Sequence, residues 1–176
     1  MGQNANTGLA QIVAEELNID VEDIQGVQPS TSDVPPLAVT AGSMSLTAFS
    51  RPLAVAAATL REALRDLAAV ELGEPVTDVL DDVGGFQTAD LRKVRYADLV
   101  DDAALVVERQ ADQSVPELYA FNSSRQKKQV GHSKSPLGIR DLVTGGRVYT
   151  ADVPMKGVLY GRAVQPPVRN ARIASL

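Results

Sequence analysis

The 176-residue sequence contains no cysteine, no tryptophan and a single histidine, His132. The absence of cysteine excludes disulfides, thiolate zinc sites, cysteine nucleophiles and iron–sulfur ligation by this chain. A single histidine excludes metal sites built on two histidines, and its position between Gly131 and Ser133 indicates a solvated loop residue rather than a catalytic one. Aromatic residues make up only 4% of the chain, so the core must be aliphatic.

Long apolar segments are missing as well. No run approaches the ~20 apolar residues that a membrane-spanning helix needs. The opening MGQNANTG has neither a basic region nor an apolar one and does not resemble a secretory signal. We therefore expect a cytoplasmic protein without a membrane span. The content of hydrophobic residues, 44%, and of charged residues, 22%, is typical of a globular chain of one or two domains.

The net charge of −5 is distributed unevenly. Residues 1–112 carry 19 acidic and 7 basic side chains, whereas residues 113–176 carry 3 acidic and 10 basic ones. Such asymmetry is typical of a basic arm that binds nucleic acid or of a basic face that docks on a protein partner. Because aromatic residues that stack on bases are few, we expect a protein partner and no nucleic acid.

An amphipathic helix is predicted near the start of the chain. Its apolar residues follow a helical spacing: Leu9, Ile12, Val13 and Leu17. We expect Asn6 or Thr7 to cap this helix and Asn18 to end it. Glu15 and Glu16 are expected off the apolar stripe, in solvent. The adjacent carboxylates at 81–82 and 101–102 are likewise expected to be solvated turn residues.

A second, alanine-rich helix is the strongest local prediction. Apolar residues recur at helical spacing from Phe49 to Leu67. Proline is tolerated in the first turn of a helix, where its missing N–H has no partner, so we place Pro52 there. Gly73 and Pro75 are expected to end the helix.

Strands are predicted where the period changes to two. Residues 76–80 and 86–88 indicate a hairpin with its turn at 81–85, followed by a strand at 94–96 and a short helix at 96–100. Residues 24–28 and 104–109 are further strand candidates, and the proline-rich residues 29–39 indicate a loop. Residues 110–136 lack a clear period and indicate a linker. Residues 137–176 are predicted to be β-rich, with the clearest strand at 157–165.

Two loops of small polar residues each precede a predicted helix. The first N–H groups of a helix have no intrahelical partner, and together with the helix dipole they attract anions. Thr40, Ser43 and Ser45 add hydroxyl donors at one loop, and Gln3 adds an amide at the other. These loops suit a phosphate or the edge of a heteroaromatic ring. The alternative from the residues alone is that they are ordinary loops with helix caps.

Several segments together resemble a known family, in the order in which that family carries them. They are Gly2-Gln3 with Thr7 and AQIVAEEL at 10–17, TAGSMS at 40–45, YADL at 96–99, DLVTG at 141–145, and GVLYGR at 157–162. They resemble the "GQG", "AQIAAEEL", "TAGSxS", "YADL", "KVTG" and "GMLHGR" segments of the molybdenum hydroxylase large subunit. That subunit belongs to the xanthine dehydrogenase and aldehyde oxidase superfamily. The order of segments is similar to that of the nicotinate dehydrogenase and isoquinoline oxidoreductase branch.

The resemblance implies an α/β (α+β) fold. Residues 1–109 would be a segment of a molybdopterin-binding domain that ends in a small β-hairpin element. Residues 110–136 would be a linker, and residues 137–176 would be the start of a hammerhead-like domain. The abrupt start and end of the match lead us to expect a naturally split subunit or a fragment.

The resemblance also implies a shared cofactor site for molybdopterin cytosine dinucleotide with molybdenum. Its cofactor-binding residues would be Gln3, Asn4, Thr40, Gly42, Ser43 and Ser45. Asn4 stands where the family has a second glycine. No segment matches the family's catalytic glutamate, so no catalytic residue and no metal ligand is expected in this chain.

The expected function is a share of a molybdenum hydroxylase that oxidises an N-heteroaromatic compound or an aldehyde. The chain would be active only with partner subunits, which would supply the remaining catalytic segment and the iron–sulfur clusters. The alternative is a non-catalytic assembly subunit of a hetero-oligomer, which would use the same fold as an interface and touch no cofactor.

Overall fold

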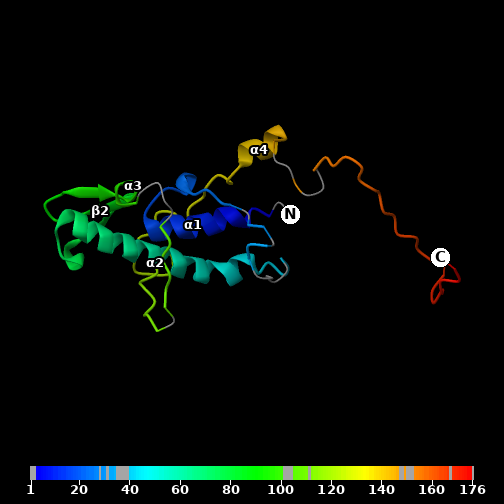
Figure 1. Cartoon of the computed structure of the whole chain (residues 1–176), viewed down its shortest axis with the longest axis horizontal. Coiled ribbons are helices and arrows are strands. Elements are labelled where there is room, and N and C mark those ends of the chain that lie inside the picture. Colours follow the sequence, from blue (N-terminus) through cyan, green and yellow to red (C-terminus); the bar gives the residue numbers. More distant parts are fainter. Residues whose placement is uncertain are drawn as a thin grey trace. The chain divides into compact units, whose positions relative to one another are not determined.

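The computed structural model describes residues 3–27, 29–30, 32–34, 40–100, 105–110, 112–146, 149, 153–166 and 168–175 (Figure 1). Gly2 and the acidic pair at 101–102 lie outside these residues, as do parts of the predicted loop at 29–39. The chain divides into two units, Met1–Ile139 and Arg140–Leu176. The described residues form an α+β structure with four α-helices and one three-stranded antiparallel sheet, consistent with the predicted class.

The first unit is built on two helices that run parallel to each other, α1 (Ala5–Leu17) and α2 (Ser45–Leu72). Near their starts, a methyl group added to Gly8 would lie 3.1 Å from Cδ2 of Leu46. Further along, Ile12 packs with Ala54 and Ala58. The residue numbers of the contacting side chains therefore rise together along both helices. Both helix N-termini lie at the same end of the pair (Figure 1).

Helix α2 is longer than the sequence predicts. It begins at Ser45, so Pro52 lies inside the helix and our placement of this proline in the first turn is wrong. Pro52 cannot donate to the carbonyl of Ala48, but both residues are exposed, and water can donate in its place. The predicted end is confirmed, because Gly73 adopts a left-handed conformation with φ of 68° and donates to the carbonyls of Ala69 and Val70.

Helix α1 confirms the predicted end and corrects the predicted start. Asn18 follows the helix in a left-handed conformation with φ of 50°. The residue before the helix is Asn4, and its side chain makes no capping hydrogen bond, so the prediction of Asn6 or Thr7 as the cap is wrong. Thr7 is buried, and its Oγ1 accepts a hydrogen bond from the Leu137 N–H at 3.0 Å.

The predicted hairpin and third strand are present with shifted bounds. Strands β1 (Leu80–Asp82), β2 (Gly85–Gln87) and β3 (Lys93–Arg95) pair in sequence order. A short 3₁₀ helix, η2 (Val76–Asp78), replaces the first part of the predicted strand, and α3 (Tyr96–Leu99) follows the sheet as predicted. A second 3₁₀ turn, η1 (Val21–Asp23), follows α1. The candidates at 24–28 and 104–109 form no strand among their described residues.

The sheet packs on the second half of α2. Phe86 is fully buried and lies in one core cluster with Leu64, Ala68 and Val94. A side chain at Gly85 would place its Cβ 2.2 Å from the carbonyl oxygen of Val94, so the strands approach too closely for any larger residue.

Residues 112–137 lie on α1 and α2 instead of forming an open connection. Leu118, Tyr119 and Ala120 are buried, and Leu118 and Ala120 belong to the same core cluster as Ile12. The polar composition that suggests a linker has a different cause: many of the polar groups of this segment bind side chains of α1, as described below.

The second unit contains little regular structure. Helix α4 (Ile139–Thr144) ends at a turn in which Gly145 has φ of 74°, and Gly157 lies in the predicted turn. The strand predicted at 157–165 is absent, and all described residues from 153 to 166 are exposed, including Leu159 and Tyr160. A strand requires a partner for its backbone hydrogen bonds, and none is present for these residues in the described part of the chain.

Candidate functional site

The two predicted cofactor loops lie at the same end of the helix pair. Gln3 and Asn4 precede α1, and the residues from Thr40 to Met44 precede α2, which starts at Ser45. Because α1 and α2 are parallel, both helix N-termini and both dipoles point toward this end (Figure 1). Of the six predicted residues, Gln3, Asn4, Thr40, Gly42 and Ser43 are exposed and Ser45 is half-buried.

The backbone of both loops is left-handed at defined positions. Asn4 has φ of 54°, Gly42 has φ of 59° and Ser43 has φ of 56°. Glycine adopts this conformation without strain, and asparagine is among the side chains that tolerate it best. The asparagine at the family's glycine position therefore keeps the backbone conformation that a glycine would allow.

Neither helix start is capped by a side chain. Asn4 and Met44 occupy the position before each helix, and neither forms a side-chain cap. Among the described residues, the side chains of Gln3, Thr40, Ser43 and Ser45 make no hydrogen bond within the chain. The free N–H groups and hydroxyls at this end are therefore available to an anionic ligand.

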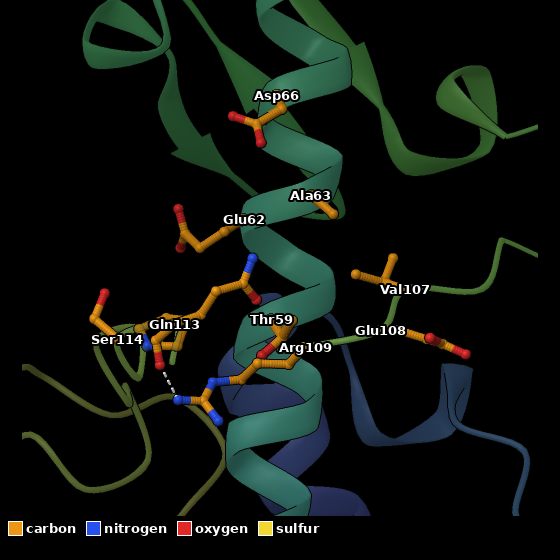
Figure 2. Close-up of a pocket in the computed structure, with 10 residues that line it drawn as sticks. Thr59, Glu62, Ala63, Asp66, Val107, Glu108, Arg109, Gln113 and Ser114 are labelled. Carbon is orange, nitrogen blue, oxygen red and sulfur yellow. Dashed lines mark hydrogen bonds between the residues drawn. The ribbon is translucent and has the colours of Figure 1, made fainter. Parts of the chain in front are cut away.

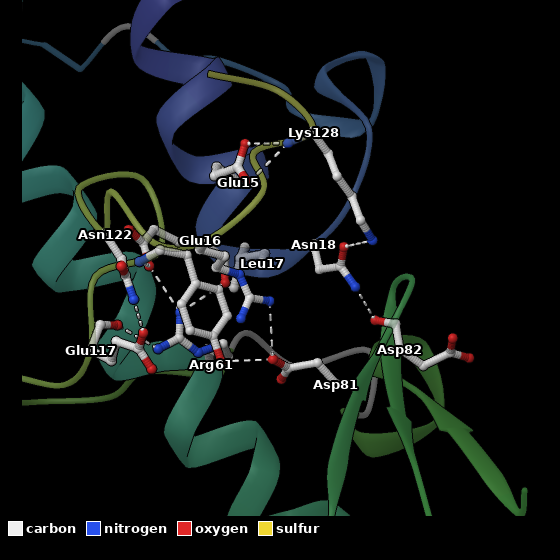
Figure 3. A network of polar contacts seen from close by, with 12 residues as sticks. Glu15, Glu16, Leu17, Asn18, Arg61, Asp81, Asp82, Glu117, Asn122 and Lys128 are labelled. Carbon is white, nitrogen blue, oxygen red and sulfur yellow. Dashed lines mark hydrogen bonds and ion pairs between the residues drawn. The ribbon is translucent and has the colours of Figure 1, made fainter. Parts of the chain in front are cut away.

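Two adjacent carboxylates of α1 are buried, which corrects our expectation that they face solvent. Glu15 is 5% exposed, and its oxygens accept hydrogen bonds from the backbone N–H groups of Lys128, Gln129 and Val130 at 2.7–3.2 Å. Glu16 is fully buried and accepts from the N–H groups of Tyr119 and Ala120, each at 3.0 Å (Figure 3). The two carboxylates thus bind residues 117–130 to α1.

Arg61 of α2 is the counter-ion of Glu16. Its Nη1 donates to Oε2 of Glu16 at 2.8 Å, and its Nη2 donates to the carbonyl of Glu117 at 2.7 Å. The guanidinium carbon also lies 3.6 Å from the centre of the Tyr119 ring, and that of Arg125 lies at the same distance. Sequence reasoning missed this cluster, although Glu16 follows Ile12 by four residues and so lies on the same helix face.

Asp81 joins the sheet to this cluster and is not the solvated residue that we expected. It accepts hydrogen bonds from Arg65 and from the Tyr119 hydroxyl, both at 2.7 Å. Burial by itself would raise the pKa of Asp81, but the hydrogen bonds from Tyr119 and Arg65 outweigh it and hold this pKa below its usual value. Burial and the hydrogen bond to Asp81 raise the pKa of Tyr119 to about 12. These groups are held in one protonation state near neutral pH, so the cluster is structural in character.

A pocket of about 600 Å³ lies between α2 and residues 107–116 (Figure 2). Three of its lining side chains are acidic, namely Glu62, Asp66 and Glu108. Arg109 also lines it, and the Nε of this residue is buried without a hydrogen-bond partner. None of the six predicted cofactor residues lines this pocket, and no motif in the sequence indicates it.

Other kinds of site are absent from the described residues. They contain no group of three or more side chains that could hold a metal ion, and none of their helices is both long and apolar enough to cross a bilayer. His132 is exposed, and its Nε2 lies 3.0 Å from the Lys127 carbonyl. The end of the helix pair and the pocket on α2 remain as candidate sites, together with a smaller pocket of about 370 Å³ beside the sheet that Glu74, Thr77 and Thr88 help to line.

Comparison with known proteins connects this fold to one family. Residues 1–138 match the molybdopterin cofactor-binding domain. Over 167 residues the chain is 29% identical to a subunit of nicotinate dehydrogenase from Pseudomonas putida, an alignment that covers 95% of this chain and 14% of that protein. Over 173 residues it is 26% identical to the membrane-bound aldehyde dehydrogenase (pyrroloquinoline-quinone) of Gluconacetobacter polyoxogenes, covering 96% and 22%. The chain thus spans less than a quarter of the length of either relative.

Proposed function

This chain belongs to the molybdopterin cofactor-binding domain family, and from that membership we propose that its two N-terminal loops bind part of a molybdopterin cofactor. The proposed contacts are Gln3 and Asn4 on the pterin side and Thr40, Gly42, Ser43 and Ser45 on the phosphate or nucleotide side. The observation that carries the proposal is the parallel packing of α1 and α2, because it brings the two loops to one end. In an antiparallel pair they would lie at opposite ends.

The residues at this end suit a ligand with phosphate groups. Two uncapped helix N-termini supply backbone N–H donors and the positive ends of two dipoles. The left-handed backbone at Gly42 and Ser43 is one that glycine adopts without strain, and both residues carry small side chains. The bound molybdenum would supply the redox chemistry, and this chain would hold and orient the organic part of the cofactor.

We further propose a molybdenum-containing dehydrogenase or hydroxylase as the whole assembly. The names of the two relatives, a nicotinate and an aldehyde dehydrogenase, support an N-heteroaromatic compound or an aldehyde as the small-molecule substrate. We propose that the cofactor is the cytosine dinucleotide form of molybdopterin. Because the chain has no cysteine, the iron–sulfur clusters would be bound by partner subunits, and a partner would also supply the catalytic base.

The alternative of a non-catalytic assembly subunit is supported by the apolar side chains at the same end. Met44, Leu46 and Phe49 are exposed by 54%, 45% and 38% of their surface. Large exposed apolar side chains that lie together are typical of a surface covered by another polypeptide. Both the cofactor-binding hypothesis and the assembly-subunit hypothesis expect a partner polypeptide at this end. The measurement that distinguishes them is therefore the cofactor content.

The test is the pterin content of the full chain, purified with its partners and extracted for pterin fluorescence. We expect the double variant Ser43→Gly/Ser45→Ala to carry ~10-fold less pterin per chain, because two hydrogen bonds to a charged group are lost. Glycine at 43 keeps the left-handed backbone, so the variant removes hydroxyls without adding strain.

Thr77→Ala, an exposed hydroxyl in η2 near the sheet, is the matched control and should keep the normal pterin content. Unchanged pterin in the double variant together with a weaker complex would reject the cofactor proposal and favour the assembly subunit.

A further inference from the structure

The two helices of the first unit are joined by one polar link. In the described residues, the only hydrogen bonds between α1 and α2 are those that Nη1 of Arg61 makes to Glu16, at 2.8 Å to the carboxylate and 3.0 Å to the main-chain carbonyl. Arg61 is 1% exposed and Glu16 is fully buried. Truncating one partner would leave an uncompensated buried charge, so this link resists displacement.

The apolar contacts described between the two helices involve small or aliphatic side chains. Gly8 faces Leu46, and Ile12 packs with Ala54 and Ala58. Apolar contacts are not directional, and small side chains interlock weakly, so such a surface specifies the axial register of two helices poorly. A guanidinium that must reach both a carboxylate and a carbonyl on one turn of α1 specifies the register well.

Residues 117–120 strengthen this link from outside. The second guanidinium nitrogen of Arg61 donates to the Glu117 carbonyl at 2.7 Å, and the Glu16 carboxylate accepts from the N–H groups of Tyr119 and Ala120. Arg61 and Glu16 are therefore both held in place by a third segment (Figure 3). Glu15 differs, since its hydrogen bonds go to residues 128–130 and none goes to α2.

We propose that Glu16 and Arg61 are positioning residues that set the axial register of α1 on α2, and thereby the separation of the two N-terminal loops. The consequence for cofactor binding rests on the proposed function, whereas the register can be measured without any cofactor. A slip of one helical turn would move one loop by ~5.4 Å relative to the other. Groups on the two loops would then no longer reach the same ligand.

The experiment uses the absence of native cysteine in this 176-residue chain. One double variant, Gly8→Cys/Leu46→Cys, places thiols at the observed contact, and a second, Gly8→Cys/Ser50→Cys, places them one turn further along α2. Disulfide formation is sensitive to the distance and direction of the two Cβ atoms. The ratio of the two cross-linking rates therefore reports the register, and we expect the 8–46 pair to form faster.

We expect Arg61→Lys to lower this ratio by at least about threefold, because an ammonium group cannot make the forked contact of a guanidinium. We expect a similar fall in Glu16→Gln, because the amide nitrogen cannot accept and the charge opposite Arg61 is lost. Glu15→Gln is the matched control, since it changes the adjacent buried carboxylate, and it should keep the ratio. Leu64→Ala removes a core side chain beside the sheet and should lower stability while keeping the ratio. If Glu16→Gln fails to fold, Arg61→Lys decides the question.

An unchanged ratio in Arg61→Lys, or an equal fall in Leu64→Ala, would overturn the proposal. Pterin content measured on the same variants separates this inference from the proposed function. A lower ratio with normal pterin content supports the positioning role and rejects the two loops as the cofactor site.

Discussion

The Tyr119 hydroxyl donates a hydrogen bond to the Asp81 carboxylate at 2.7 Å, which links the segment after residue 112 to the first strand of the sheet. Arg65 donates to the other oxygen of the same carboxylate, and Arg125 lies 3.4 Å from it. The ring of Tyr119 is held between the guanidinium groups of Arg61 and Arg125. This arrangement ties α2, the sheet and residues 117–125 into one unit and predicts a specific dependence of stability on pH.

At acid pH, the free energy of unfolding should depend on the protonation of Asp81. Its pKa is lowered in the folded chain, so its contribution is fully present above the unfolded value of ~3.9 and is lost as the pH falls through the folded pKa. We expect Asp81→Asn to lower stability at pH 7 and to flatten the change of unfolding free energy with pH below ~4. Urea unfolding at several pH values measures this. Asp23→Asn, at an exposed carboxylate, is the control, and an equally steep acid limb in Asp81→Asn would contradict the prediction.

At alkaline pH, the free energy of unfolding should depend on the deprotonation of Tyr119, and here stability should fall as the pH rises. Its pKa is raised to about 12, so its contribution is complete below the unfolded value of ~10 and is lost as the pH rises through the folded one. The ultraviolet absorbance of tyrosinate follows this titration directly. Removal of the negative charge in Asp81→Asn should shift the Tyr119 titration to lower pH. No shift would mean that burial alone raises this pKa.

The left-handed backbone at Asn4 predicts a glycine preference. Asn4→Gly should leave the free energy of unfolding nearly unchanged, whereas Asn4→Val should lower it by about 1–2 kcal/mol, because a β-branched side chain is strained at φ of 54°. Thermal unfolding of the two variants measures the difference. Asn6→Val, at an exposed position inside α1, controls for helix propensity. Equal stabilities of Asn4→Gly and Asn4→Val would show that residue 4 does not hold this conformation.

The close approach of two strands at Gly85 predicts intolerance of any side chain. Gly85→Ala should destabilise the chain by about 1–3 kcal/mol, because the new Cβ would meet the Val94 carbonyl and force the strands apart. Gly26→Ala is the matched control, since nothing lies within 4 Å of the position that its Cβ would take. Chemical denaturation of both variants tests the prediction, and similar losses for the two alanines would argue against the pairing of β2 with β3.

Local sequence signals determined much of the first unit. The spacing of apolar residues predicted both long helices, and the end residues Asn18 and Gly73 were predicted correctly because left-handed helix ends depend on the residue itself. The hairpin, the third strand and the short helix after it were predicted from the change of the apolar spacing to a period of two and from the pair Gly84-Gly85. The family resemblance rested on motifs in order, and the match over residues 1–138 confirms it.

Tertiary structure decided what the local pattern could not express. Glu15 and Glu16 were predicted to be solvent-exposed because charged side chains are usually exposed. Backbone N–H groups at 119–120 and 128–130, which are distant in the sequence, donate to the two carboxylates and make their burial favourable. Residues 110–136 were predicted to be a linker because several of their hydrogen-bond partners, such as Glu15 and Glu16, lie more than a hundred positions away along the chain. The placement of both loops at one end likewise depends on the parallel packing of α1 and α2, a relation between elements that no local period contains.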